Sequence, residues 1–240
     1  MSNKISLAVT SYNRSNKTVR SFSNVLSDDR ITEIIIVDDH SDEKTFNDLS
    51  SQISLLGCSK LKIHRNTKNL GAFLNKCRAI DLASNDWIIL LDSDNIIDVS
   101  YLDSLPTELD EKTFYLPSVA ECSSPNLDYS RYSGKLLGID DFRALMHSQD
   151  PIDLCLINTG NYLVNKRTYT SCVKACKNLI NPLAVDVLYL LCLCFKNEKN
   201  FKLNVVTGLK YQHDTTSNKS WYRQNASESE KIAFQLRSMI

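Results

Sequence analysis

The chain has 240 residues, and its 28 basic residues are matched by 28 acidic ones. This length is enough for one large domain or two small ones with a sizeable core. The balanced charge gives no reason to expect nucleic acid or an anionic membrane as the main partner.

No run of about 18 apolar residues occurs, so we expect no transmembrane segment, while peripheral association with a membrane stays open. The first residues, 1–4, lead straight into a strand without the apolar core of a signal peptide. The eight cysteines show neither zinc-ribbon spacing nor a Cys-x-x-Cys motif. We therefore expect reduced, structural thiols and a cytoplasmic location.

The first hundred residues alternate apolar, strand-like runs with stretches of helical periodicity. Strands are expected at residues 5–10, 34–37, 61–64 and 87–91, with a helix after each of the first three. The strand starts recur at intervals of about 26 to 29 residues, which is the length of a strand–helix unit. This repeat predicts a mostly parallel sheet with helices on both faces.

Polar residues follow three of these strands, at 10–14, 38–41 and 92–95. Ligands of parallel α/β sheets bind beyond the carboxyl ends of the strands, so the three segments should converge on one site. The last segment places two carboxylates, Asp92 and Asp94, directly after an apolar strand. Such a pair suits a divalent cation with a diphosphate attached. The alternative is a plain strand-to-turn transition, where Asp and Ser are common.

The pattern is less regular after residue 105. Strands are expected at 113–116, 162–164 and 203–206, helices at 140–147, 184–195 and 227–240, and a loop at 117–135. Neither G-x-G-x-x-G nor G-x-x-x-x-G-K-[ST] occurs anywhere in the chain. Their absence argues against a NAD dehydrogenase and a P-loop protein.

Four short motifs occur in order along the chain: Thr10–Arg14, Val37–Ser41, Asn69–Gly71 and Leu91–Asp94. In this order they resemble the motifs of the family 2 glycosyltransferases, closely over residues 4–103 and more thinly to about residue 215. The resemblance implies an α/β, single-domain, Rossmann-like A-type glycosyltransferase fold with a mostly parallel central sheet. Residues 1–105 would form the nucleotide-sugar-binding half, 106–225 the acceptor-binding and catalytic half, and 226–240 a C-terminal helix.

The resemblance also implies a reaction. A sugar would move, with inversion, from a nucleoside-diphosphate donor to an acceptor hydroxyl, with uridine diphosphate as the expected nucleotide and Mn²⁺ or Mg²⁺ as the cofactor. The acceptor would be a glycan, a lipid-linked molecule or a protein, as in glycan or polysaccharide synthesis.

The resemblance assigns roles to individual positions. The nucleotide would be bound by Thr10, Tyr12, Arg14, Asp39, Lys76, Asp92 and Ser93. Asp94 would be the main metal ligand, with Asp92 and His213 beside it, and Gly160 and Asn161 would lie near the donor sugar and acceptor. Asp39 would hydrogen-bond the base, because its carboxylate suits the imide N–H of a pyrimidine.

The proton of the acceptor hydroxyl needs a general base. The family places it as the Asp of a Glu-Asp pair that opens a late helix, and the matching position here is Asp186, with Val185 in place of the Glu. An Asp at a helix start is often only a cap, which is the alternative reading. Asp153 and Asp141 are the reserve candidates.

Two positions depart from the family pattern. Asn95 stands where an Asp often follows the D-x-D, and Lys76-Cys77 stands where Arg-Asn is common, so the cation is kept and the amide is lost.

Two other functions stay open. One is a nucleotidyltransferase, although the segment 10–14 lacks the glycines that such enzymes use, and the other is a non-catalytic nucleotide-sugar binder.

Overall fold

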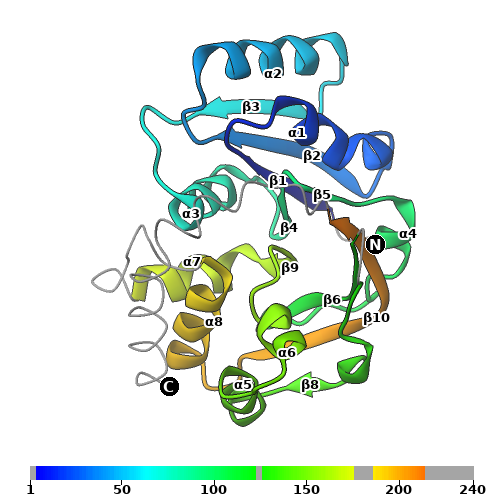
Figure 1. Cartoon of the computed structure of the whole chain (residues 1–240), viewed down its shortest axis with the longest axis vertical. Helices are drawn as coiled ribbons and strands as arrows, with labels where there is room; N and C mark the ends of the chain where they lie inside the picture. The colour runs from blue at the N-terminus through cyan, green and yellow to red at the C-terminus, as the bar shows by residue number, and fades with distance from the viewer. Residues whose placement is uncertain (1–3, 123–125, 176–185, 214–240) are drawn as a thin grey trace.

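The computed structural model describes residues 4–122, 126–175 and 186–213, with only the backbone for 186–189. These residues form a mixed sheet with helices on both faces (Figure 1). The strand order along the sheet is β3 (Leu61–Arg65), β2 (Ile31–Asp38), β1 (Ile5–Ser11), β4 (Trp87–Asp92), β9 (Asn161–Asn165), β6 (Thr113–Glu121), β10 (Lys202–His213) and β5 (Asn95–Ile96). The predicted α/β class with a central, helix-flanked sheet is confirmed.

The first half of the chain alternates strands and helices, as its repeat predicts. Its elements are β1 (Ile5–Ser11), α1 (Ser15–Phe22), the 3₁₀ helix η1 (Ser23–Val25), β2 (Ile31–Asp38), α2 (Glu43–Leu55), β3 (Leu61–Arg65), α3 (Ala72–Leu82), β4 (Trp87–Asp92), β5 (Asn95–Ile96) and α4 (Val99–Asp103). β1 pairs in parallel with β2 and β4, and β2 pairs in parallel with β3. Parallel crossovers are right-handed, so α1 and α2 share one face and α3, which leads back to β4, covers the other.

The second half adds strands and helices to both sides of this unit. Its elements are β6 (Thr113–Glu121), β7 (Leu127–Asp128), the 3₁₀ helix η2 (Ser130–Tyr132), β8 (Leu136–Leu137), α5 (Ile139–Met146), α6 (Pro151–Leu156), β9 (Asn161–Asn165), α7 (Lys166–Ala175), α8 (Asp186–Asn197) and β10 (Lys202–His213). β9 lies between β4 and β6 and is antiparallel to both, so it joins the two halves into one sheet. Helices α7 and α8 pack together beside α3.

The last strand curls the sheet back toward its first half. β10 runs parallel to β6, and its final residues then pair antiparallel with β5, His213 opposite Asn95. Because β5 starts only a few residues after β4, this pairing brings the end of β10 to the carboxyl end of β4 (Figure 1). His213 is thereby placed beside Asn95, which is 118 residues earlier in the sequence and directly follows the acidic motif, Asp92 to Asp94.

The expected loop at 117–135 is wrong in its first part, where β6 continues to Glu121. Pro117 and Ser118 interrupt the apolar pattern there. The register between β6 and β10 shifts after Val206, and the Ser118 hydroxyl donates to the carbonyl of Leu209 across the irregularity. A strand bulge of this kind accommodates a proline that cannot donate a ladder hydrogen bond. The bulge also interrupts the apolar pattern of β10 in the sequence. The expected strand therefore ends at residue 206, whereas β10 continues to His213.

Three α-helices were not expected, namely α6, α7 and the five-residue α4. α6 has a start signal that was overlooked, since Asp150 caps it by accepting from the Ile152 amide and Pro151 occupies its first turn. α7 is mostly polar, and only Tyr169 and Cys172 are buried on it. The helix expected at 184–195 is α8, with 184–185 outside the described residues. The helix expected at 227–240 also lies outside them.

A buried carboxylate ties together the amino end of the sheet. Glu33 of β2 is 4% exposed and accepts from the Ser6 hydroxyl at 2.5 Å and from Lys62 Nζ at 2.8 Å. The Ser84 hydroxyl and amide, in the turn before β4, donate to the same carboxylate. Burial alone raises the pKa of Glu33, but these donors outweigh it and lower the pKa from 4.5 to about 2.

This depressed pKa predicts an acid-sensitive contribution to stability. The contribution is complete above the unfolded-state pKa of 4.5 and is lost as the pH falls from there toward about 2. Glu33→Gln should lower the free energy of unfolding at pH 7 by about 2–3 kcal/mol, because charged hydrogen bonds are lost. Urea unfolding from pH 3 to pH 7 measures this. Glu33→Gln should lose less stability on acidification than the wild type. The control Glu108→Gln, at an exposed position, should lose as much stability on acidification as the wild type. Identical acid dependence of the Glu33 variant and the wild type would contradict the assignment.

Candidate active site

The polar ends of β1, β2 and β4 meet at one edge of the sheet, as predicted. The strand register places Thr10 between Val37 of β2 and Asp92 of β4. The amide of Asp39 donates to the carbonyl of Ser11, and the amide of Ser93 donates to the carbonyl of Thr10. Backbone pairing therefore continues beyond the strands and fixes the relative positions of the three segments.

Asp92 ends β4 and is surrounded closely. Its Oδ1 lies 2.8 Å from Lys76 Nζ and accepts from the Thr10 hydroxyl at 3.3 Å. The Lys76 side chain is 3% exposed, so its charge is compensated within the site. On the other side, a Cβ built on Gly160 would lie 1.8 Å from Asp92 Oδ2. Only glycine lets the loop before β9 approach the carboxylate this closely.

Asp94 forms a second ion pair, with Arg14. The Arg14 guanidinium donates to Asp94 Oδ2 at 2.8 Å, and Asp94 is 8% exposed. Its Oδ1 has no hydrogen-bond partner among the described residues. Ser93, between the two acids, is buried. Each acid of the motif is thus paired with one cation, and one carboxylate oxygen remains open.

His213 lies beside Asn95, the residue that directly follows Asp94. It pairs with Asn95 through the backbone, and its Nδ1 lies 2.7 Å from Asn95 Oδ1. Tyr211, two residues earlier, is buried and contacts the Thr159 hydroxyl. The end of β10 is therefore in contact with both the acidic motif and the loop that carries Gly160.

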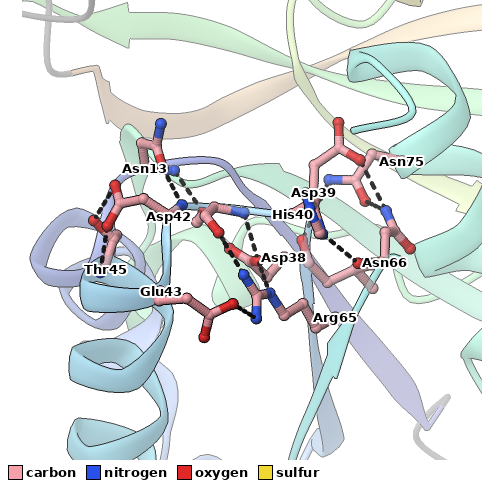
Figure 2. A network of polar contacts seen from close by, with 12 residues as sticks. Asn13, Asp38, Asp39, His40, Asp42, Glu43, Thr45, Arg65, Asn66 and Asn75 are labelled. Atoms are coloured by element: carbon pink, nitrogen blue, oxygen red, sulfur yellow. Dashed lines mark hydrogen bonds and ion pairs between the residues drawn. The ribbon is translucent and has the colours of Figure 1, made fainter. Parts of the chain in front are cut away.

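Asp39 holds the loop that leads into α3. Its Oδ1 accepts from Asn66 Nδ2 at 2.9 Å and from the Leu70 amide at 2.8 Å, and its Oδ2 accepts from the Gly71 amide at 2.9 Å. Figure 2 shows Asp39 beside Asn66 and Asn75, which bond to each other. A carboxylate has about four acceptor positions, so roughly one is left for a base. Asp39 therefore has a structural role, and the base contact predicted from sequence stays a prediction.

A second network, next to the first in Figure 2, fixes the loop after β2. The buried Asp38 accepts from the Ser41 amide and hydroxyl, and Asn13 joins the loops after β1 and β2 by bonding to Ser41 and Asp42. Arg65 donates to the Ser41 carbonyl. Asn13 and His40 have positive φ angles of 54° and 63°, which sharply turn the chain after each strand.

These supporting residues were missed in the sequence. Asn66 had a signal, because it directly follows β3 and so extends the rule of polar strand ends to a fourth strand. Asn75 and Arg65 had none, since a polar residue on a helix or strand usually faces solvent.

Other predicted residues take different positions. Tyr12 is 48% exposed at the rim. Asn161 is fully buried and accepts from the Tyr101 hydroxyl of α4 at 2.8 Å, so it is tied to α4 while its neighbour Gly160 contacts Asp92. Cys77 lies 3.3 Å from the Tyr169 hydroxyl of α7, and burial raises the pKa of its thiol to about 11. It supports helix packing.

The acids considered as general base differ in their surroundings. Asp186 is the first residue of α8, and its side chain lies outside the described part of the structure. Burial raises the pKa of Asp153, but hydrogen bonds from Ser148, Tyr132 and Arg131 outweigh it and leave the pKa below its usual value. Asp141 accepts from the Gly138 amide as part of the cap of α5. Both reserve candidates therefore have structural partners.

The donor set fits a hard divalent cation in part. Within the described residues no cluster of three or more His, Cys, Asp or Glu side chains could hold a metal without help. Asp94 offers an open oxygen, Asp92 precedes it by two residues, and His213 contacts the following residue, Asn95. Mg²⁺ and Mn²⁺ commonly take a few protein ligands and complete their shell with phosphate oxygens and water. The residues suit a metal that binds together with a diphosphate.

The chain belongs to the glycosyl transferase family 2, whose family model matches residues 6–166. The family predicted from the motifs is confirmed. A search of curated proteins found no match to the sequence.

No helix in the described part of the chain has the length and apolar character needed to cross a membrane.

Solved structures share the fold. They include GalNAc-T7 with UDP, GalNAc and Mn²⁺ (TM-score 0.65, 15% identity, 89% of this chain and 44% of that one). They also include TarS 1–349 of S. aureus with UDP-GlcNAc (TM-score 0.66, 13% identity, 98% of this chain and 66% of that one). A third is the mannosyltransferase PcManGT of Pyrobaculum calidifontis with GDP-Man and Mn²⁺ (TM-score 0.63, 11% identity, 98% of this chain and 64% of that one). The chain thus has the A-type glycosyltransferase fold and spans less than two thirds of each of these proteins.

The hydrogen bonds of Asp39 predict a large structural cost for its removal. Asp39→Ala should lower the free energy of unfolding by about 3 kcal/mol or more, because the Leu70 and Gly71 amides lose a charged acceptor. Asp42→Ala removes only the exposed cap of α2 and should cost clearly less. Urea unfolding compares the two variants. Equal losses would contradict the view that Asp39 holds the loop before α3.

Proposed function

We propose that this protein is a metal-dependent, inverting glycosyltransferase that moves a sugar from a nucleoside-diphosphate donor, UDP-linked by preference, to an acceptor hydroxyl. One observation carries the proposal. Asp92 and Asp94 lie at the carboxyl end of a central strand, each paired with a cation, Lys76 or Arg14. An edge with both carboxylates and cations suits a metal–diphosphate, which is itself a pair of opposite charges.

The neighbours support a nucleotide-sugar and a metal. GalNAc-T7 and PcManGT were solved with Mn²⁺, and the nucleotides in the three structures are UDP, UDP-GlcNAc and GDP-Man. The fold therefore does not choose between uridine and guanosine. The proposal of UDP rests on Asp39, because its remaining acceptor position suits the N3–H of a uracil; this contact disfavours cytosine, which has no proton there, and does not by itself exclude guanine.

The two cations have a clear part in the reaction. When bound, the metal would neutralise the charge that grows on the departing diphosphate. Arg14 and Lys76 already sit next to the acids that would hold the metal, so the diphosphate oxygens can take over as their partners. Binding of the metal–nucleotide would then exchange one set of ion pairs for another, so that Lys76 and Arg14 keep anionic partners.

The chemical step is a single displacement. The acceptor oxygen attacks the anomeric carbon from the face opposite the diphosphate, the bond to the diphosphate breaks with its electron pair, and the hydroxyl proton passes to a base. We assign the base to Asp186, because it opens α8 and because Asp153 and Asp141 are engaged by structural donors. The acceptor would be a glycan, a lipid-linked molecule or a protein.

The close approach of Gly160 predicts a binding defect for a larger residue. Gly160→Ala should displace the Asp92 carboxylate and weaken the binding of UDP with Mn²⁺ by about 10-fold or more, the value of one charged hydrogen bond. Gly138→Ala is the matched control, since a Cβ there meets nothing closer than 4.0 Å. Isothermal calorimetry measures both. Unchanged affinity in Gly160→Ala would mean that this contact does not shape the nucleotide site.

The assignment of Asp186 predicts a defect in turnover alone. Asp186→Asn should slow sugar transfer by about 10²–10⁴-fold, while the affinity for the nucleotide and metal stays near that of the wild type. Asn caps helices about as well as Asp, so a pure capping role predicts normal turnover and stability. Transfer to a panel of acceptors, with melting temperature and UDP affinity, separates these outcomes. Full activity of Asp186→Asn would rule out this base, and a wild type that binds donor without transfer to any acceptor would indicate a non-catalytic binder.

A further inference from the structure

Asn95 lies between the acidic motif and the last strand. It directly follows Asp94, is 2% exposed, and forms β5 together with Ile96. Its backbone pairs with that of His213, and its Oδ1 lies 2.7 Å from His213 Nδ1. The imidazole is thus fixed both through the strand and through its own ring.

This hydrogen bond determines which ring nitrogen carries the proton. A carboxamide oxygen only accepts, so His213 Nδ1 is the donor, and in the neutral ring the lone pair is then on Nε2. Nε2 makes no hydrogen bond within the described residues. The ring also has Tyr211 edge-on at 6.5 Å between centroids. The side chain is therefore held in one orientation, in the tautomer that a metal requires of Nε2.

We infer that Asn95 is a positioning residue for the metal, which it serves by holding His213 in a ligating tautomer. The inference rests on the proposed function. An amide provides the same acceptor oxygen as a carboxylate without adding a third negative charge beside Asp92 and Asp94. Asn95 thus provides the contact to His213 and adds no charge repulsion to the metal-free site. The alternative is that Asn95 only fastens the end of β10.

The experiment is a double-mutant cycle on Mn²⁺ affinity, measured by electron paramagnetic resonance with saturating UDP. Asn95→Ala should weaken Mn²⁺ binding by about 10–100-fold, the usual effect of removing the partner of a metal-bound histidine. Asn95→Asp keeps the acceptor and should bind the ion at least as tightly as the wild type. If Asn95 acts through His213, the double variant Asn95→Ala/His213→Ala should bind no more weakly than His213→Ala.

A spectroscopic signal distinguishes ligation from fastening. Pulsed electron paramagnetic resonance of the wild type and of Asn95→Asp should show nitrogen coupling from an imidazole on Mn²⁺. His213→Ala should lose this coupling, and Asn95→Ala should lose or weaken it. The control is Asn165→Ala, which removes an equally buried asparagine at the far end of β9 and should leave Mn²⁺ binding unchanged.

Several results would overturn the inference. They are wild-type affinity in Asn95→Ala, fully additive losses in the double variant, or absence of nitrogen coupling in a wild type that binds Mn²⁺ with UDP. Melting temperatures show whether each variant is folded. If Asn95→Ala is not folded, the Mn²⁺ affinity of Asn95→Asp still tests whether an acceptor oxygen at this position is enough. A wild type that binds UDP equally well with and without the metal would instead overturn the metal dependence of the proposed function.

Discussion

The pairing of charge at the carboxyl edge of the sheet is the constraint on which the site depends. Lys76 is almost completely buried, and the Asp92 carboxylate 2.8 Å away helps to compensate its ammonium charge. Arg14 and Asp94 repeat this arrangement one step along the motif. In the proposed function, the same pairs would exchange partners and provide the groups that hold a metal–diphosphate. Folding and binding therefore place the same demand on these four side chains.

The rest of the architecture serves to keep those side chains in register. Right-handed crossovers put α3 on the face where Lys76 can reach β4, and Asp39 fixes the loop from which α3 starts. Gly160 lets β9 begin against Asp92, and the curl of β10 delivers His213 to Asn95. A site is positioned accurately when its groups stand on strands and helices and their neighbours hold them by hydrogen bonds.

The sequence predicted the parts of this structure that follow from local pattern. The strand–helix repeat predicted the first half, and the polar strand ends predicted the edge of the candidate site, because the carboxyl ends of parallel strands must share one edge. The second half was harder. Pro117 and Gly208 break the pattern of two strands that are continuous in space, and α7 has too few apolar residues to show its period. The role of Asp39 in holding its loop depends on contacts 27 to 32 residues away, which no local pattern reveals.

The central claim is that the acidic strand end binds a metal together with a nucleoside diphosphate. It is tested most directly by calorimetric titration of UDP into the wild type and Asp94→Asn, each with Mn²⁺ and with a chelator. We predict that the wild type binds UDP tightly only with Mn²⁺, and that Asp94→Asn loses most of the difference between the two conditions. Equal affinity of the wild type in both conditions, or an unchanged metal effect in Asp94→Asn, would contradict the account.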